Sequence, residues 1–139
     1  MADRVIAACE ACFEEHKDDC SGFVRAVAAQ LHVELAGLAN DIVDTMRAGG
    51  QWRTLPDGAA ARLSAAAGKF VLAGLRGDER HEHSNHGHVA VVVDGPLAHG
   101  RYPSAYWGNL GGEGAKFQTI NWAWTVDDRD RVTYAEHGL

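Results

Sequence analysis

Two residue patterns, separated along the chain, place the strongest constraint on its fold. As far as Ala67, apolar residues recur at helical spacing, whereas from Phe70 onward they form short β-branched or aromatic runs. Helices followed by consecutive strands, rather than alternating with them, predict an α+β domain whose sheet is mainly antiparallel. No internal repeat or linker interrupts the 139 residues, so we expect residues 1–139 to form a single domain.

Capping and turn residues set the expected limits of these elements. Asp18 and Asp19 lie where an N-cap belongs, and Gly68 follows the alanine-rich segment as a stop signal. The Asp94-Gly95-Pro96 sequence marks a turn between strands. The expected helices cover residues 5–13, 23–31, 42–46 and 59–67, and the expected strands cover residues 70–75, 88–93, 104–110, 120–126 and 131–136.

Composition and charge exclude several classes of protein. Thirteen Lys and Arg against nineteen Asp and Glu give a net charge of -6, which leaves little basis for binding a nucleic-acid backbone. The apolar runs are shorter than the roughly 18 residues of a membrane helix, so we expect no membrane partner. Early acidic residues do not suit a signal peptide, which indicates a cytosolic protein or export by a route that reads no N-terminal Sec signal. All three cysteines lie within the first twenty residues, too close together to bridge distant segments.

Cys20 is the candidate nucleophile. It lies in the sequence Asp19-Cys20-Ser21-Gly22-Phe23-Val24, at the first turn of the most periodic helix. Free backbone N–H groups and the helix dipole favour a thiolate there, and a neighbouring cationic His would lower the thiol pKa below its ordinary ~8.5. A lone cysteine is most often a small buried apolar residue. The small Ser and the Gly that follow favour the nucleophile, because they would let a peptide carbonyl approach.

His88 is the candidate base for this thiol. It begins the apolar run at residues 88–93, where a strand would hold its ring rigidly, whereas the other seven histidines lie on helix surfaces, in a polar tract or near the C-terminus. A histidine at a strand start is often only a polar residue at the sheet rim. A Cys at a helix start followed by a His at a strand start is nevertheless the order found in papain-like cysteine hydrolases.

The nucleophile segment resembles the corresponding motif of NlpC/P60 peptidases, which are cell-wall enzymes with a reduced papain-like fold. From about Asp18 to Tyr134 the chain is also similar to the first family of type VI secretion amidase effectors. This similarity rests on residues 19–31, 70–75, 87–97, 102–103 and 128–134.

The resemblance implies roles for particular residues, and the chemistry that it implies needs no cofactor. By position, Cys20 matches the nucleophile and His88 the base, and the Cys20 backbone N–H would donate to the oxyanion. The group that orients the imidazole falls near Trp107, whose side chain cannot accept a proton, so either its backbone carbonyl or the neighbouring Asn109 would serve.

The resemblance also implies a biological role. Members of the effector family are antibacterial toxins, made in the cytoplasm and delivered by the type VI secretion apparatus into the periplasm of a neighbouring cell. They cut peptidoglycan stem peptides, typically between D-glutamate and meso-diaminopimelate, and a cognate periplasmic immunity protein protects the producer. A housekeeping cell-wall endopeptidase of the same fold is the alternative within the enzyme class.

Other polar clusters offer competing functions. The tract of residues 78–88 contains four histidines, His81, His83, His86 and His88. Residues 78–85 interrupt the resemblance and residues 78–86 have the composition of a solvated loop; a non-catalytic metal-binding module is the alternative that the histidines raise. Cys9 and Cys12 share a helical face. The simpler interpretation is that both are core residues, and the alternative is that they form a redox pair or bind a metal. The aromatic residues of the second half could line a substrate groove or bind sugars, although at strand spacing half of them belong in the core: Tyr102, Tyr106, Trp107, Trp122 and Trp124.

Overall fold

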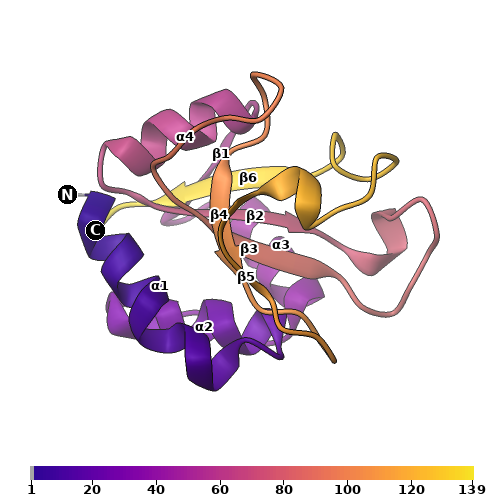
Figure 1. Cartoon of the computed structure of the whole chain (residues 1–139), viewed down its shortest axis with the longest axis horizontal. Coiled ribbons are helices and arrows are strands. Elements are labelled where there is room, and N and C mark those ends of the chain that lie inside the picture. The colour runs from indigo at the N-terminus through magenta and orange to yellow at the C-terminus, as the bar shows by residue number, and fades with distance from the viewer. Residues whose placement is uncertain (1) are drawn as a thin grey trace.

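The computed structural model describes residues 2–139 (Figure 1). In this part of the chain there are four α-helices: α1 (Ala2–His16), α2 (Cys20–Gln30), α3 (Ala39–Arg47) and α4 (Gly58–Ala66). The six strands are β1 (Trp52–Leu55), β2 (Phe70–Leu75), β3 (His88–Val92), β4 (Ser104–Trp107), β5 (Ala115–Thr119) and β6 (Thr133–His137). Two short 3-10 turns complete the structure, η1 (Gly77–Glu79) and η2 (Ile120–Trp122).

The strands form one sheet in the order β1-β6-β2-β3-β4-β5, and every neighbouring pair is antiparallel. The expected α+β class and antiparallel sheet are therefore confirmed. The two strands that the sequence predicts best, β2 and β3, lie at the centre, paired from Leu75 with His88 to Val71 with Val92.

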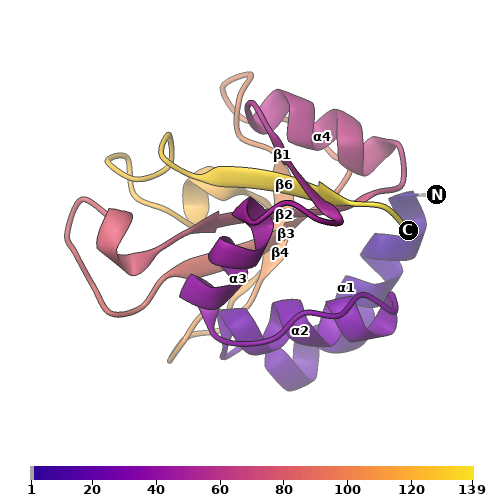
Figure 2. The same ribbon diagram turned by 180° about the vertical axis from the view of Figure 1, so that it is seen from behind.

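Helices cover both faces of this sheet, with α1, α2 and α3 on one face and α4 on the other (Figures 1 and 2). Phe70 and Leu72 of β2 belong to the core beneath α1–α3, whereas the intervening Val71 and Ala73 belong to the core beneath α4. All four are fully buried, which explains why β2 is a continuous apolar run rather than an alternating one. The two cores clamp β3 in position, and with it the histidine at its start.

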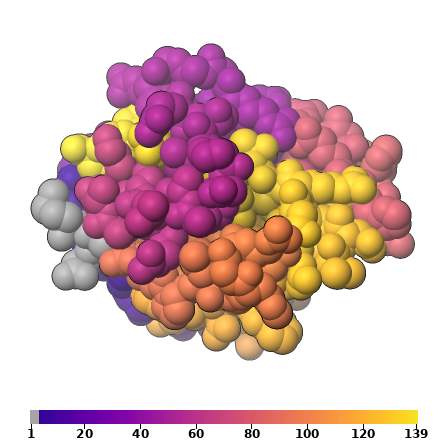
Figure 3. All heavy atoms as spheres, turned by 90° about the horizontal axis from the view of Figure 1, so that it is seen from above, coloured from indigo at the N-terminus to yellow at the C-terminus, as the bar shows by residue number. Residues whose placement is uncertain are grey.

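The face over α4 shows how closely distant segments pack. In Figure 3 the segment around residue 100 lies against the region of α4. A Cβ added to Gly58, the first residue of α4, would lie only 2.1 Å from the carbonyl oxygen of Arg101. The helix can begin here only because glycine has no side chain.

The four predicted helices are confirmed, with α1 extending beyond its predicted end. Asp57 caps α4, because its side chain accepts a hydrogen bond from the Ala60 N–H at 2.8 Å. Gly68 ends that helix with a φ of 92°. Asp19 is the N-cap residue of α2, but its side chain makes no capping hydrogen bond.

The prediction of a strand at residues 120–126 is wrong. This segment forms η2 and further turns, in which the Trp124 N–H donates to the Ile120 carbonyl at 3.2 Å. Ile120 and Trp124 are buried four residues apart, while Trp122 is 74% exposed. The apolar spacing of this segment follows a helical turn rather than a strand.

Two strands, β1 and β5, lie where none is predicted, and both are edge strands of the sheet. The middle three residues of β5 are exposed, so its sequence carries no apolar pattern from which it could be recognised. Strand β4, predicted over residues 104–110, is shorter than predicted and ends at Trp107. All three cysteines are free, and none of the helices in residues 2–139 has the length and apolarity needed to cross a membrane.

Candidate active site

A pocket of about 940 Å³ opens where α2, α3 and β3 all begin. Its wall contains Cys20 and His88, together with Asn109 from the loop after β4 and Trp124 from the turn after η2. The two residues proposed from sequence to act together, 68 positions apart (88 minus 20), thus line the same cavity.

The end of β4 holds the segment that carries Cys20. A Cβ added to Gly108 would lie 2.5 Å from the Asp19 carbonyl oxygen, so the two backbones are in direct contact. Next to it, the Asn109 N–H donates to the Lys17 carbonyl at 2.9 Å. These contacts fix the start of α2, where Cys20 is the first helical residue.

Gly22 lies against the side chain of Asp19. A Cβ at this position would lie 2.6 Å from a carboxylate oxygen of Asp19. The carboxylate of Asp19 folds back over the first turn, where it accepts a hydrogen bond from the Ser21 hydroxyl at 3.2 Å. In the free protein the glycine therefore makes room for Asp19.

The expectation of a lowered pKa for Cys20 is wrong. Burial raises the pKa of the thiol, and the nearby negative charge of Asp19 adds to that effect. Backbone N–H groups of Val89, Ser21 and Cys20 itself lower the pKa, but burial prevails. The residue is only 8% exposed, so the thiol is protonated near neutral pH in the free protein.

Because the Val89 backbone N–H acts on the Cys20 thiol, Cys20 lies beside the start of β3. His88, the residue before Val89, is half-buried and is the first residue of that strand. Burial lowers the pKa of His88 to about 4, assisted by the positive charge of Arg80. The imidazole is therefore neutral near pH 7 and can accept a proton.

Trp124 is the residue that packs against the His88 ring. The two rings meet edge to face, with centroids 5.0 Å apart and planes at 68°. Trp107 is buried at the end of β4, and Asn109 lines the pocket. Neither makes a hydrogen bond to the His88 ring, and no hydrogen bond to that ring is found within residues 2–139.

Replacement of Trp124 by alanine is expected to raise the pKa of His88 from about 4 towards its ordinary 6.5, because water would replace the indole against the imidazole. We expect a shift of about one unit or more, measured by NMR titration of the His88 ring. The matched control is Trp122→Ala, which removes an indole that is 74% exposed and should leave the titration unchanged. The same titration midpoint in Trp124→Ala and wild type would contradict this role.

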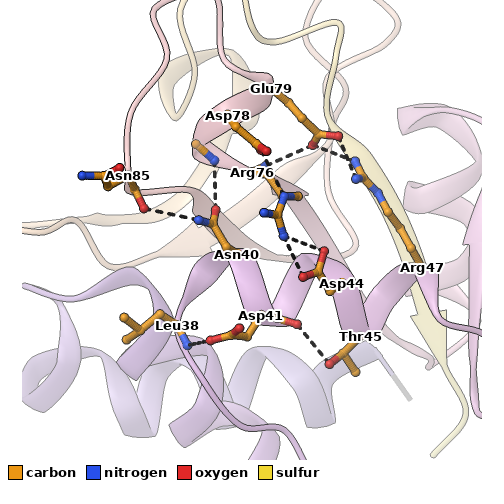
Figure 4. Close-up of polar contacts among 11 residues, drawn as sticks. Leu38, Asn40, Asp41, Asp44, Thr45, Arg47, Arg76, Asp78, Glu79 and Asn85 are labelled. Carbon is orange, nitrogen blue, oxygen red and sulfur yellow. Dashed lines mark hydrogen bonds and ion pairs between the residues drawn. The ribbon is translucent and has the colours of Figure 1, made fainter.

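The histidine-rich tract forms part of the pocket wall. Besides His88, its residues in the lining are Arg80 and the four residues 84–87. Asn40 of α3 holds the loop between β2 and β3 at two points, accepting from the Gly77 N–H at 2.9 Å and donating to the Asn85 carbonyl at 3.2 Å (Figure 4). Asn85 and His86 are exposed, as expected of a solvated loop, although they also line the pocket.

The residues that could bind a metal do not come together. Among residues 2–139, no group of three or more His, Cys, Asp or Glu side chains is placed to hold a metal ion. Cys9 and Cys12 are buried in the core under the sheet, as the simpler of the two sequence interpretations expects. A metal-binding module thus has no ligand set in the described part of the chain.

No protein-family model matches the chain. The chain is nevertheless 40% identical, over 128 residues, to an amidase of Pseudomonas aeruginosa; the match covers 89% of this chain and 78% of the relative. The chain therefore belongs to a family of amidases. The relative that shows this is the peptidoglycan amidase Tse1.

Proposed function

We propose that this chain hydrolyses stem peptides of peptidoglycan at the amide between D-glutamate and meso-diaminopimelate. Cys20 is the nucleophile and His88 the base. The observation that carries the proposal is the 40% identity to the peptidoglycan amidase Tse1 across 89% of the chain. The pocket that contains both Cys20 and His88 supports the assignment of the two roles.

The protonation states suggest how the first step proceeds. A neutral thiol and a neutral imidazole mean that His88 takes the proton of Cys20 as the sulfur attacks the carbonyl carbon. The oxyanion accepts a hydrogen bond from the Cys20 backbone N–H at the start of α2, where the helix leaves N–H groups free. The C–N bond then breaks, the imidazolium gives its proton to the leaving amine, and a thioester remains on Cys20.

Water completes the cycle. His88 removes a proton from the water as its oxygen attacks the thioester carbonyl, and the C–S bond then breaks. The proton returns to the sulfur, so both side chains regain their starting forms. The group that orients the imidazole is the backbone carbonyl of Trp107 or the side chain of Asn109. Either would accept a hydrogen bond from the His88 ring in the substrate complex, since neither does so in the free protein.

The wider assignment rests on the resemblance to the amidase effectors and to NlpC/P60 peptidases. Under it, residues 1–139 are one cysteine amidase domain, with the papain-like arrangement of a helix-borne Cys and a strand-borne His. The protein is made in the cytoplasm, passes through a type VI secretion apparatus and acts in the periplasm of a target cell. A cognate periplasmic immunity protein protects the producer.

Digestion of purified sacculi tests the proposed function. Muropeptides released by the protein and separated by mass spectrometry should end in D-glutamate on one fragment and begin with diaminopimelate on the other. Intact stems after prolonged incubation with correctly folded protein, or cleavage at another bond, would contradict it.

A further inference from the structure

The pocket wall is electrically asymmetric. Its acidic members are Asp18, Asp19 and Asp41, whereas Arg80 is the one Lys or Arg among the described residues that line it. A negatively charged part of a ligand is therefore repelled by much of the wall and attracted at Arg80.

The guanidinium of Arg80 has N–H donors that make no hydrogen bond within the described residues. Its Nε is buried against Asp128, whose carboxylate oxygen lies 3.7 Å away in a loose ion pair, so the N–H donors that a ligand could use are those of the two Nη atoms. Its Nη1 makes one long hydrogen bond to the His86 carbonyl at 3.4 Å. A guanidinium with five N–H donors and a planar fork is suited to hold a carboxylate through two of them.

Arg80 is also held in place before any ligand arrives. Asp128 is 3% exposed, and its second oxygen accepts the N–H of His81 at 2.7 Å, so it fixes the backbone beside Arg80. On the other side, Arg47 of α3 makes a two-point ion pair with Glu79 at 2.8 and 2.9 Å (Figure 4). This restraint reduces the entropy that the side chain would lose on binding.

The positive charge lies close to the reacting groups. Arg80 contributes to the lowered pKa of His88, so its field reaches the imidazole. In a stem peptide with γ-linked D-glutamate, the free α-carboxylate is a short aliphatic chain away from the amide carbonyl that is cut. Arg80, Cys20 and His88 line the same pocket, so a carboxylate held by Arg80 would keep that carbonyl in the pocket that contains the Cys20 sulfur.

We propose that Arg80 binds the free α-carboxylate of the D-glutamate residue and so determines which stem peptides are cut. The inference rests on the proposed function and specifies the substrate chemistry of the same site. Peptidoglycan in which this carboxylate is amidated, giving D-isoglutamine, is then a poor substrate.

The experiment compares two synthetic stem peptides that differ only at this group, one with D-glutamate and one with D-isoglutamine. Wild-type protein should cleave the acid form with a kcat/KM about 10- to 100-fold above that for the amide, in line with a charged hydrogen-bonded pair. Arg80→Gln should lose that factor on the acid form and little on the amide, so that the two rates converge. Arg80→Lys, which keeps the charge and loses the fork, should retain part of the preference.

The matched control is Arg76→Gln. It removes the same charge from the start of the same loop, but the Arg76 guanidinium is paired with Asp44 and Asp78 and does not line the pocket (Figure 4). This variant should keep the wild-type preference for the acid form.

Two outcomes would overturn the inference in distinguishable ways. Equal cleavage of both stems by wild type, or an unchanged preference in folded Arg80→Gln, would leave the amidase function standing and remove Arg80 from recognition. Failure of wild type to cleave either stem would refute the proposed function, and the role of Arg80 with it.

Discussion

Substitution of Cys20 by alanine is expected to lower kcat/KM on peptidoglycan by about 10⁴-fold or more, because the covalent route through a thioester is lost. The fold should survive, since the change removes one sulfur atom from a small residue at the edge of the pocket. Reversed-phase separation of muropeptides from treated sacculi measures the rate, and thermal unfolding measures the stability.

The chain offers a matched control in Cys12→Ala, which removes a thiol of similar burial, 7% exposed against 8%, from the core beneath α1. It should cost stability, as the loss of a buried side chain does, and leave kcat close to that of wild type. Activity lost equally in the two variants would indicate a structural effect of cysteine removal and contradict a nucleophile at position 20.

Substitution of His88 by glutamine is expected to lower kcat/KM by about 10³-fold or more, because no other group would take the thiol proton. Since the Cys20 pKa is raised, few molecules carry a thiolate at neutral pH and the variant has little reserve activity. Raising the pH should restore part of the activity of His88→Gln, as the thiol ionises without assistance. A rate that stays within about tenfold of wild type at pH 7 would exclude His88 as the base.

The same substitution should change the response of stability to acid. In the folded protein the pKa of His88 is about 4, below the ordinary 6.5, so the unfolded chain binds more protons between those values. Wild-type stability therefore falls as the pH drops from 6.5 to about 4, by about 2 to 3 kcal/mol from this residue. Urea unfolding at pH 6.5 and 4.5 should show a smaller loss in His88→Gln, and an identical loss in both proteins would contradict the burial of a neutral imidazole.

The best predicted parts of the fold are those whose apolar residues are buried in a regular pattern. Residues 23–31 bury one face of a helix and Phe70–Leu75 are buried on both faces of the sheet, so the spacing of apolar residues predicts α2 and β2. Asp57 and Gly68 set the ends of α4 by local hydrogen bonding and backbone conformation, which sequence carries directly. Edge strand β5 escapes prediction since its exposed residues carry no such pattern.

The proposed nucleophile and base of the pocket can be recognised in the sequence, whereas the residues around them cannot. Cys20 and His88 stand out through residue type and position at the start of an element. Trp124 is assigned to a strand, although its contact with His88 depends on a turn that brings residues 36 positions apart together (124 minus 88). Arg80 looks like one of many charges in a polar loop, because its placement comes from Asp128, far along the chain.

The pKa of Cys20 is another property that the sequence predicts wrongly. A cysteine at a helix start predicts a lowered pKa from the dipole and the backbone N–H groups. The folded pocket reverses that prediction, because burial acts on the same atom with the larger effect. How far each side chain is removed from water is a property of the whole fold, and local sequence does not report it.

Alkylation bears most directly on whether Cys20 is the reacting sulfur. Iodoacetamide would be added in steps at about pH 9, and peptide mapping would give the fraction of Cys9, Cys12 and Cys20 modified at each step. Cleavage of sacculi should fall in proportion to modification of Cys20 alone, reach zero when that modification is complete, and be unaffected by a chelator. Full activity with Cys20 completely alkylated, or activity removed by the chelator while Cys20 stays free, would contradict the thiol mechanism.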